Sequence, residues 1–288
     1  MNGRRYDIDG LRALAILLIV GYHAFPGVIP GGFVGVDIFF VISGFFVTQS
    51  IISESPQNFS IKAFYARRVS RLVPSLLLVL ITLLVFASFF LLPNDYVQLC
   101  KQVFGGLFFI SNFLLWRGAD YFDSEAIKQP LLHLWSLAIE GQFYLVWPLL
   151  LYWRRRVNIR TIISIIFILS LILTLCISSR LNTAAFYLPL TRMWEFAAGA
   201  LIFFQNKEGE LSNSRVVQKF HYSSVVSLLG IFIIIFSSIS FYKYDLYPGW
   251  RTICPVLGTI LILLTEHSRF NENFLSHKWL IWRNAKLS

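Results

Sequence analysis

The sequence predicts an all-α fold, a polytopic integral membrane helix bundle, and three observations support this fold class. Hydrophobic residues make up 56% of the chain and charged residues only 14%, at a mean hydropathy of +0.65. Such a composition lies well beyond that of soluble globular domains. Apolar runs of membrane-spanning length recur along the whole chain, and the basic residues gather between these runs. The lipid bilayer is therefore the expected solvent of this protein.

Eight apolar runs are long enough to cross a bilayer. A hydrocarbon core about 30 Å thick requires about 20 apolar residues in a helix. The first run follows Arg4 and Arg5, but no small-residue cleavage site comes after it, so we expect it to be retained as a span. The predicted spans are Leu11–Ile29, Phe33–Ile52, Val73–Leu92, Leu131–Trp153, Thr161–Ser178, Phe186–Phe204, Ser223–Phe241 and Thr252–Thr265.

The apolar stretch Val103–Trp116 is interpreted as a short re-entrant or interfacial segment, because about 14 residues are too few for a full span. If it did cross the bilayer, the run Arg154–Arg156 would lie outside the cytoplasm, against the tendency of cytoplasmic loops to carry Lys and Arg. Without that crossing, the cytoplasmic loops hold about 17 of the 25 Lys and Arg residues. The N-terminus is therefore predicted to be cytoplasmic. The segment Pro93–Pro130 becomes an external loop, with the acidic residues Asp95, Asp120, Asp123 and Glu125.

Composition also argues against other classes of protein. The net charge of +10 could suggest nucleic-acid binding, but the basic residues do not form a patch with aromatic residues on a soluble face. The three cysteines, Cys100, Cys176 and Cys254, are far apart and have no metal-ligand spacing. We therefore expect no nucleic-acid partner and no metal site.

Ionisable side chains inside membrane spans are costly and mark candidate functional sites. Arg12 and His23 are eleven residues apart, so they lie on nearly one face of the first span, about 16 Å apart along its axis. Asp37 enters the second span at a depth similar to that of His23, which allows a contact between them. Two other interpretations stay open: Arg12 could reach the cytoplasmic rim as an anchor, and His23 could be a hydrogen-bonded core histidine.

Two further pairs of ionisable residues fall within predicted spans. His133 and Glu140 are seven residues apart, two helical turns on one face of the fourth span. Arg192 and Glu195 are three apart in the sixth span, where they could either neutralise each other or bind substrate. His133 could equally be an interfacial, hydrogen-bonded histidine.

The basic segment Lys62–Arg71 is predicted to be cytoplasmic and allows two interpretations. It could be an ordinary positive-inside anchor. Alternatively, Arg68 and Arg71, three residues apart on a helical turn, could grip a pyrophosphate with their guanidinium groups. Gly44, within the second span, is expected to allow close helix packing.

Five segments of the chain share their sequence and their order with one protein family. They read YDIDGLRALAILLIVGYH, GGFVGVDIFFVISGFFVT, FYARRVSRLVP, PLLHLWSLAIEGQFYLVWP and TRMWEFAAGALI. Together they resemble the membrane-bound acyltransferase-3 family, and the resemblance covers essentially the whole chain. It implies transfer of acyl groups, usually acetyl from cytoplasmic acetyl-CoA, to hydroxyls of cell-envelope glycans or of small molecules. The glycans would include O-antigen, exopolysaccharide and peptidoglycan.

The resemblance also implies roles for individual residues. The arginine and histidine of the family's first span fall on Arg12 and His23. Its RxxR motif falls on Arg68 and Arg71, and its membrane carboxylate falls on Glu140. The family domain normally continues with further helices, so we expect the acyltransferase domain at residues 1–288 to be incomplete at its C-terminus.

These considerations lead to one proposed mechanism. His23 acts as general base on an acceptor hydroxyl, and Asp37 or Glu140 orients it. The CoA diphosphate is expected at Arg12, Arg68 and Arg71. The residues expected to bind the acceptor are His133, Arg192 and Glu195.

Two rival functions use the same residues. A transporter or flippase could use the intramembrane charges to move protons or substrate. An inactive form would follow from missing C-terminal helices. In each case the expected location is the bacterial cytoplasmic (inner) membrane.

Overall fold

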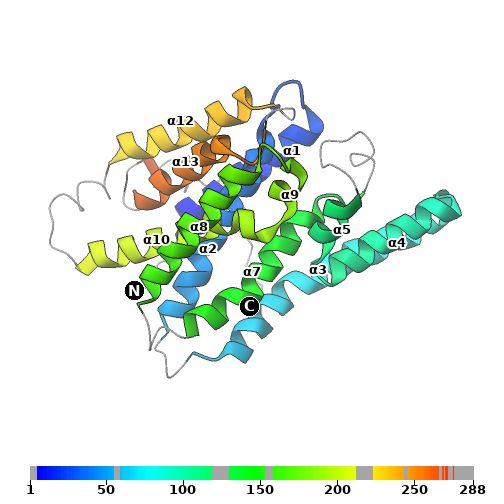
Figure 1. Ribbon diagram of the computed structural model, residues 1–288, viewed down its shortest axis with the longest axis horizontal. Coiled ribbons are helices and arrows are strands. Elements are labelled where there is room, and N and C mark those ends of the chain that lie inside the picture. Colours follow the sequence, from blue (N-terminus) through cyan, green and yellow to red (C-terminus); the bar gives the residue numbers. More distant parts are fainter. Residues whose placement is uncertain are drawn as a thin grey trace.

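All regular structure that the described residues form is helical, as predicted, and Figure 1 shows it as a computed structural model. The structure describes residues 5–54, 59–118, 130–152, 158–211, 223–242, 246–265, 268, 270–271 and 275. Parts of the predicted external loop, with Asp120, Asp123 and Glu125, lie outside these residues, as does the run Arg154–Arg156.

The bundle is organised around helix α2 (Gly35–Ile52), which follows the short turn η1 (Gly32–Val34) and is buried along most of its length. Many of its side chains are apolar, so burial against other helices removes them from both lipid and water. Among the described residues, the helices that contact α2 most extensively are α1 (Tyr6–Ala24), α7 (Leu134–Tyr152), α10 (Pro189–Leu211) and α13 (Ile253–Leu264).

Further helices pack against this central group. Helix α8 (Ile159–Ile177) packs on α10, together with the short α9 (Asn182–Tyr187). Helix α12 (Ser224–Ser240) packs on α13, which follows the turn η3 (Trp250–Thr252) (Figure 1). Side-chain caps start two of these helices: Asn158 accepts from the backbone N–H of Thr161 at 3.4 Å, and Ser223 accepts from that of Val226 at 3.4 Å.

Small residues permit the closest helix contact. A Cβ atom added to Gly44 on α2 would lie 2.0 Å from the carbonyl oxygen of Phe196 on α10. A Cβ atom added to Gly199 on α10 would lie 1.9 Å from the carbonyl oxygen of Val41. The two backbones therefore touch where each helix has a glycine, which confirms the packing role predicted for Gly44.

Helices α3 (Ile61–Phe90) and α4 (Pro93–Leu107) lie side by side and project from the bundle (Figure 1). Ser60 caps α3 by accepting from the backbone N–H of Ala63 at 3.3 Å. Helix α3 begins well before the predicted span start at Val73, so Arg68 and Arg71 lie on its first turns. A second apolar cluster joins the two helices: Leu76, Leu80, Ala87, Leu99, Val103 and Leu131.

The predicted re-entrant stretch Val103–Trp116 is not one helix. Helix α4 ends at Leu107, Phe109 has a positive φ of 54°, and α5 (Ser111–Gly118) begins after the break. The Gln142 side chain of α7 donates to the Phe109 carbonyl oxygen at 2.7 Å. This hydrogen bond satisfies a backbone acceptor at the break between the two helices. Whether this segment enters the bilayer stays a prediction.

Four helical segments among the described residues are long and apolar enough to cross a membrane: Gly32–Ile52, Ile61–Phe90, Leu134–Tyr152 and Ile159–Ile177. Two shorter apolar helical segments are Ser224–Ser240 and Trp250–Leu264. The first predicted span ends too late, because α1 stops at Ala24, just before the pair Phe25 and Pro26, where proline disfavours a helical residue before it. The total of eight spans stays a prediction.

Candidate functional site

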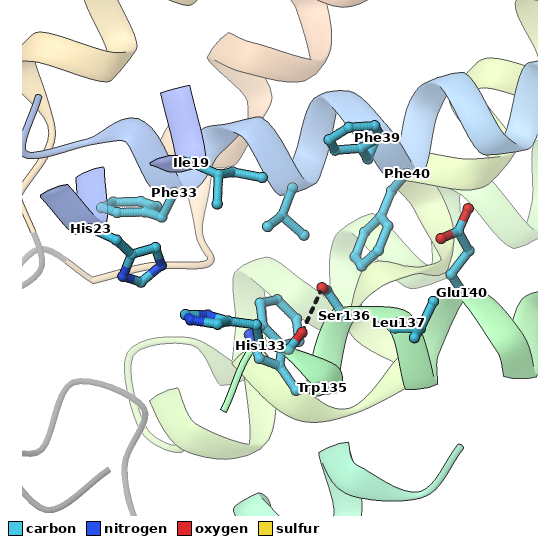
Figure 2. Close-up of a pocket in the computed structure, with 11 residues that line it drawn as sticks. Ile19, His23, Phe33, Phe39, Phe40, His133, Trp135, Ser136, Leu137 and Glu140 are labelled. Carbon is cyan, nitrogen blue, oxygen red and sulfur yellow. Dashed lines mark hydrogen bonds between the residues drawn. The ribbon is translucent and has the colours of Figure 1, made fainter. Parts of the chain in front are cut away.

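A cavity of about 290 Å³, which we call the histidine cavity, lies between α1, α2 and α7. Its lining residues are Ile19, His23, Phe33, Val36, Phe39, Phe40, His133, Trp135, Ser136, Leu137 and Glu140. Figure 2 shows His23 and His133 facing each other at one end of this cavity, whereas Glu140 lies at the other end. Three of the residues singled out from the sequence therefore share one cavity.

His23 and His133 form a pair that the sequence analysis did not predict. The last turn of α1 carries His23, and His133 directly precedes α7; their ring centroids are 4.4 Å apart. The Tyr22 ring also contacts His23, with centroids 4.9 Å apart. Both histidines are exposed, so each can meet a substrate. A neutral imidazole has one donor and one acceptor nitrogen, so the pair can accept one proton and donate another.

Two hydroxyl groups hold Glu140 at the end of the histidine cavity that lies away from His23 and His133. Ser43 of α2 and Tyr144 of α7 both donate to its Oε1 atom. Tyr144 lies one turn after Glu140 on the same face of α7, whereas Ser43 reaches it from the neighbouring helix. Glu140 is therefore fixed by hydrogen bonds of its own and lies apart from His23.

The three arginines expected to hold an anion, Arg12, Arg68 and Arg71, lie near Glu140 and Tyr144. The Arg68 guanidinium lies over the rings of Phe64 and Tyr144, 5.2 Å from each centroid. Arg12 lies over Phe46 at 4.7 Å and within electrostatic range of Arg71, Tyr144 and Glu140. Its side chain is 27% exposed, and its Nη1 atom lies 3.9 Å from Asp9 Oδ1. Three guanidinium groups near few carboxylates make a site suited to an anion.

A second cavity, of about 270 Å³, adjoins this arginine cluster, and we call it the arginine cavity. It lies between α3, α7 and the break after α4, and its lining residues are Tyr65, Arg68, Val69, Leu72, Val73, Phe108, Phe109, Gly141, Gln142, Tyr144 and Leu145. Most of these side chains are apolar or aromatic, and Arg68 is the only charged residue in this lining. The cavity thus suits a mostly uncharged ligand portion that carries an anion at one end.

Asp37 is not beside His23, so the predicted contact between them is wrong. Arg192 Nη1 donates to Asp37 Oδ1 at 2.9 Å, and the Tyr247 hydroxyl donates to Oδ2. Arg192 also donates to Glu195 Oε1 at 2.8 Å. All four side chains are at most 1% exposed. We call Asp37, Arg192, Glu195 and Tyr247 the buried quartet.

The buried quartet lies behind the wall of the histidine cavity. The wall residue Phe33 packs on Tyr247, with ring centroids 4.7 Å apart, and Arg192 lies 5.8 Å from the centroid of the wall residue Trp135. Arg192 and Glu195 line neither cavity. Of the two interpretations left open for them, the structure shows the pairing, whereas a role in binding the acceptor would require this wall to move.

Sequence reasoning missed three polar residues of this region: Ser43, Tyr144 and Tyr247. Tyr144 could have been found, because it lies four residues after Glu140 on one helix face. Tyr247 is 210 residues from Asp37 in the chain, so no local spacing connects them. Among the described residues, no three His, Cys, Asp or Glu side chains gather as a metal site.

The chain resembles known proteins along most of its length. A family profile described as an acyltransferase domain matches residues 5–282. The sequence is 32% identical, over 97% of its length, to "Peptidoglycan O-acetyltransferase OatA" of Listeria monocytogenes. It is 42% identical, over 60% of its length, to "O-acetyltransferase OatA" of Staphylococcus aureus.

The chain spans less than half the length of these two relatives, 47% of the first and 29% of the second. It is also 35% identical, over 80% of its length, to an uncharacterized protein of Haemophilus influenzae and covers 97% of that protein. No solved structure matches it significantly.

Proposed function

The chain belongs to the acyltransferase-3 family, and from this premise we propose that it is a membrane-bound O-acyltransferase. It transfers an acyl group, acetyl in the first instance, from cytoplasmic acyl-CoA to a hydroxyl of a cell-envelope carbohydrate. The names of two relatives refer to O-acetyl transfer, and one of them names peptidoglycan, which makes peptidoglycan the first acceptor to test.

One observation carries this proposal: a single helix, α7, connects a pair of histidines to a cluster of arginines. His133 at its start meets His23, and Glu140 on the next turns lies within electrostatic range of Arg12 and Arg68. A base for the acceptor hydroxyl and a cationic site for a diphosphate are the two components that acyl transfer from CoA requires.

The donor is assigned to the arginine side of α7. Arg68 and Arg71 lie three residues apart on α3, and Arg12 faces them from α1, within range of Arg71. Guanidinium groups bind phosphate oxygens in pairs of parallel hydrogen bonds, so they can hold the CoA diphosphate at the cytoplasmic side. The apolar arginine cavity then accommodates the uncharged arm of the donor.

The acceptor is assigned to the histidine cavity. His23 takes the proton of the acceptor hydroxyl as its oxygen attacks the thioester carbonyl carbon, the C–S bond breaks, and the CoA thiolate is protonated. His133 lies on His23 and can bind the acceptor or relay the proton. Glu140 offsets the positive charge of the arginines, whereas the buried quartet supports Phe33 and Trp135 in the cavity wall.

The proposed location is the bacterial cytoplasmic (inner) membrane, with several spans and a cytoplasmic N-terminus. The distribution of Lys and Arg between the predicted loops supports this orientation. The donor site at Arg68 then faces the compartment that contains CoA.

The decisive experiment measures release of CoA thiol by the purified protein, in lipid vesicles, supplied with acetyl-CoA and a disaccharide-peptide fragment of peptidoglycan. An acyltransferase releases thiol only when both compounds are present, and the fragment gains one acetyl group for each thiol. A transporter or flippase moves the fragment or protons across the vesicle without releasing thiol. An inactive form does neither.

A further inference from the structure

The Glu140–Tyr144 pair lies where the two cavities approach each other. Glu140 lines the histidine cavity and Tyr144 lines the arginine cavity. The Tyr144 hydroxyl donates to Glu140 Oε1, and Ser43 of α2 holds the same oxygen atom. These hydrogen bonds connect α2 to α7 between the two cavities.

A donor that extends from the arginine cluster to His23 has to pass the Glu140–Tyr144 pair. Arg12 and His23 are separated by about 16 Å along α1, since each helical residue advances the axis by about 1.5 Å. The diphosphate end stays near Arg12 and Arg68, and the thioester end has to reach the histidine pair. The line between the two ends runs along α7, from Tyr144 past Glu140 to His133.

We infer that Tyr144 is a positioning residue that partitions the donor cavity from the acceptor cavity and keeps water away from the donor thioester. The inference rests on the proposed function. Without the partition, water from the histidine cavity attacks the thioester carbonyl carbon and the C–S bond breaks. The water oxygen and one hydrogen go to the released carboxylic acid, and the other hydrogen goes to the CoA thiol. Closed active sites commonly suppress such side reactions by excluding water.

Arg68 holds Tyr144 from the donor side of this partition. Its guanidinium lies over the Tyr144 ring, 5.2 Å from the centroid, while the Tyr144 hydroxyl donates to Glu140. This cation–π contact steadies the ring, so the arginine that the proposed function assigns to the donor diphosphate also keeps Tyr144 in place beside Glu140.

The test compares two products of the same reaction in the full protein. Thiol release from acetyl-CoA is measured with and without the disaccharide-peptide fragment of peptidoglycan, and the coupling ratio is acetylated fragment formed per thiol released. In Tyr144→Ala, we expect release without acceptor to rise severalfold and the coupling ratio to fall. Tyr144→Phe keeps the ring over Arg68 but loses the hydrogen bond to Glu140, so it should show a smaller change in the same direction.

Tyr152→Ala is the matched control, because Tyr152 is a tyrosine on the same helix whose side chain is 58% exposed. Its coupling ratio should equal that of the wild type. If Tyr144→Ala lowers the rate but leaves the coupling ratio unchanged, Tyr144 has only a structural role and the inference is wrong. Should Tyr144→Ala fail to fold, an unchanged ratio in Tyr144→Phe overturns it. Wild-type protein that releases no thiol in response to acceptor overturns the proposed function, and the inference with it.

Discussion

Arg192 and Asp37 are joined in the core of the bundle by a hydrogen bond of 2.9 Å, although 155 residues separate them in the sequence. The contact connects α10 to α2, the pair of helices that also meets at Gly44 and Gly199. Arg192 is buried together with two carboxylates, because Glu195 accepts from the same Nη1 atom. Such a group of charges is stable only while its members satisfy each other.

Removing one member of the buried quartet should therefore destabilise the protein strongly. Arg192→Ala leaves two buried carboxylates without their guanidinium, and breaking a buried ion pair costs about 3–5 kcal/mol. Thermal unfolding in detergent measures the loss. Arg67→Ala is the control: the ion pair of Arg67 with Glu54 spans 3.5 Å between half-exposed side chains, and its loss should cost at most about 1 kcal/mol. Equal effects of the two variants would contradict a structural role for the quartet.

Replacing Gly44 by a larger residue should also destabilise the protein, because α2 and α10 touch at this position. In Gly44→Ala, the new methyl group would lie 2.0 Å from the carbonyl oxygen of Phe196, so α2 and α10 must separate. A substantial fall in melting temperature is expected. The matched variant Gly27→Ala adds the same methyl group where nothing lies within 4 Å, and it should leave the melting temperature nearly unchanged. A stable Gly44→Ala protein would show that the helices are less closely packed than the structure has them.

His23 is the group on which the proposed chemistry depends. A positioned general base contributes about 10²–10⁴ in rate, so His23→Ala should lose acetyl transfer by that factor or more while expression and membrane insertion are retained. His23→Gln should fail as well, since an amide hydrogen-bonds but cannot take the proton. Because His133 lies against His23, near-normal turnover in His23→Gln would move the role of base to His133, and the double variant would then be inactive.

Donor binding should depend on the shape of the arginine side chains as well as on their charge. Arg71→Lys keeps the charge but loses the planar fork, so its affinity for acetyl-CoA should fall. Arg68→Ala should weaken binding further, since Arg68 also lines the arginine cavity. Isothermal titration with acetyl-CoA measures both effects, and Arg67→Lys, one position from Arg68, is the control. If Arg71→Lys and Arg68→Ala both bind acetyl-CoA as tightly as the wild type does, the basic segment is only a membrane anchor.

The predicted orientation in the membrane rests on the positions of the basic loops in the sequence. In a cysteine-free background, a cysteine introduced near Asp123 should react with an impermeant thiol reagent on intact cells. One introduced near Arg155 should react only after the cells are opened. Both positions lie outside the described residues, so the test is of the sequence prediction. Labelling at both sites of intact cells would contradict the predicted topology.

Local features of the sequence determined the helices and several of their faces. Long apolar runs predict spans because a bilayer requires about 20 apolar residues in succession, and α2, α3, α7 and α8 meet that requirement. Contacts within one helix also follow from helical geometry, as the Arg192–Glu195 pair shows. The stretch Val103–Trp116 is not one continuous helix, since α4 ends at Leu107, and its re-entrant or interfacial character stays a prediction.

Only the tertiary structure decided which of the functional side chains meet. The sequence predicts similar depths for Asp37 and His23, but depth does not fix the direction in which a helix face points. In the structure, α2 presents Asp37 to α10 and Tyr247. The same packing brings His133 to His23 and leaves Tyr144 between Arg68 and Glu140. Helical periodicity fixes neighbours three or four residues apart, whereas partners 97 or 210 residues away, such as Ser43 with Glu140 and Asp37 with Tyr247, depend on how whole helices pack.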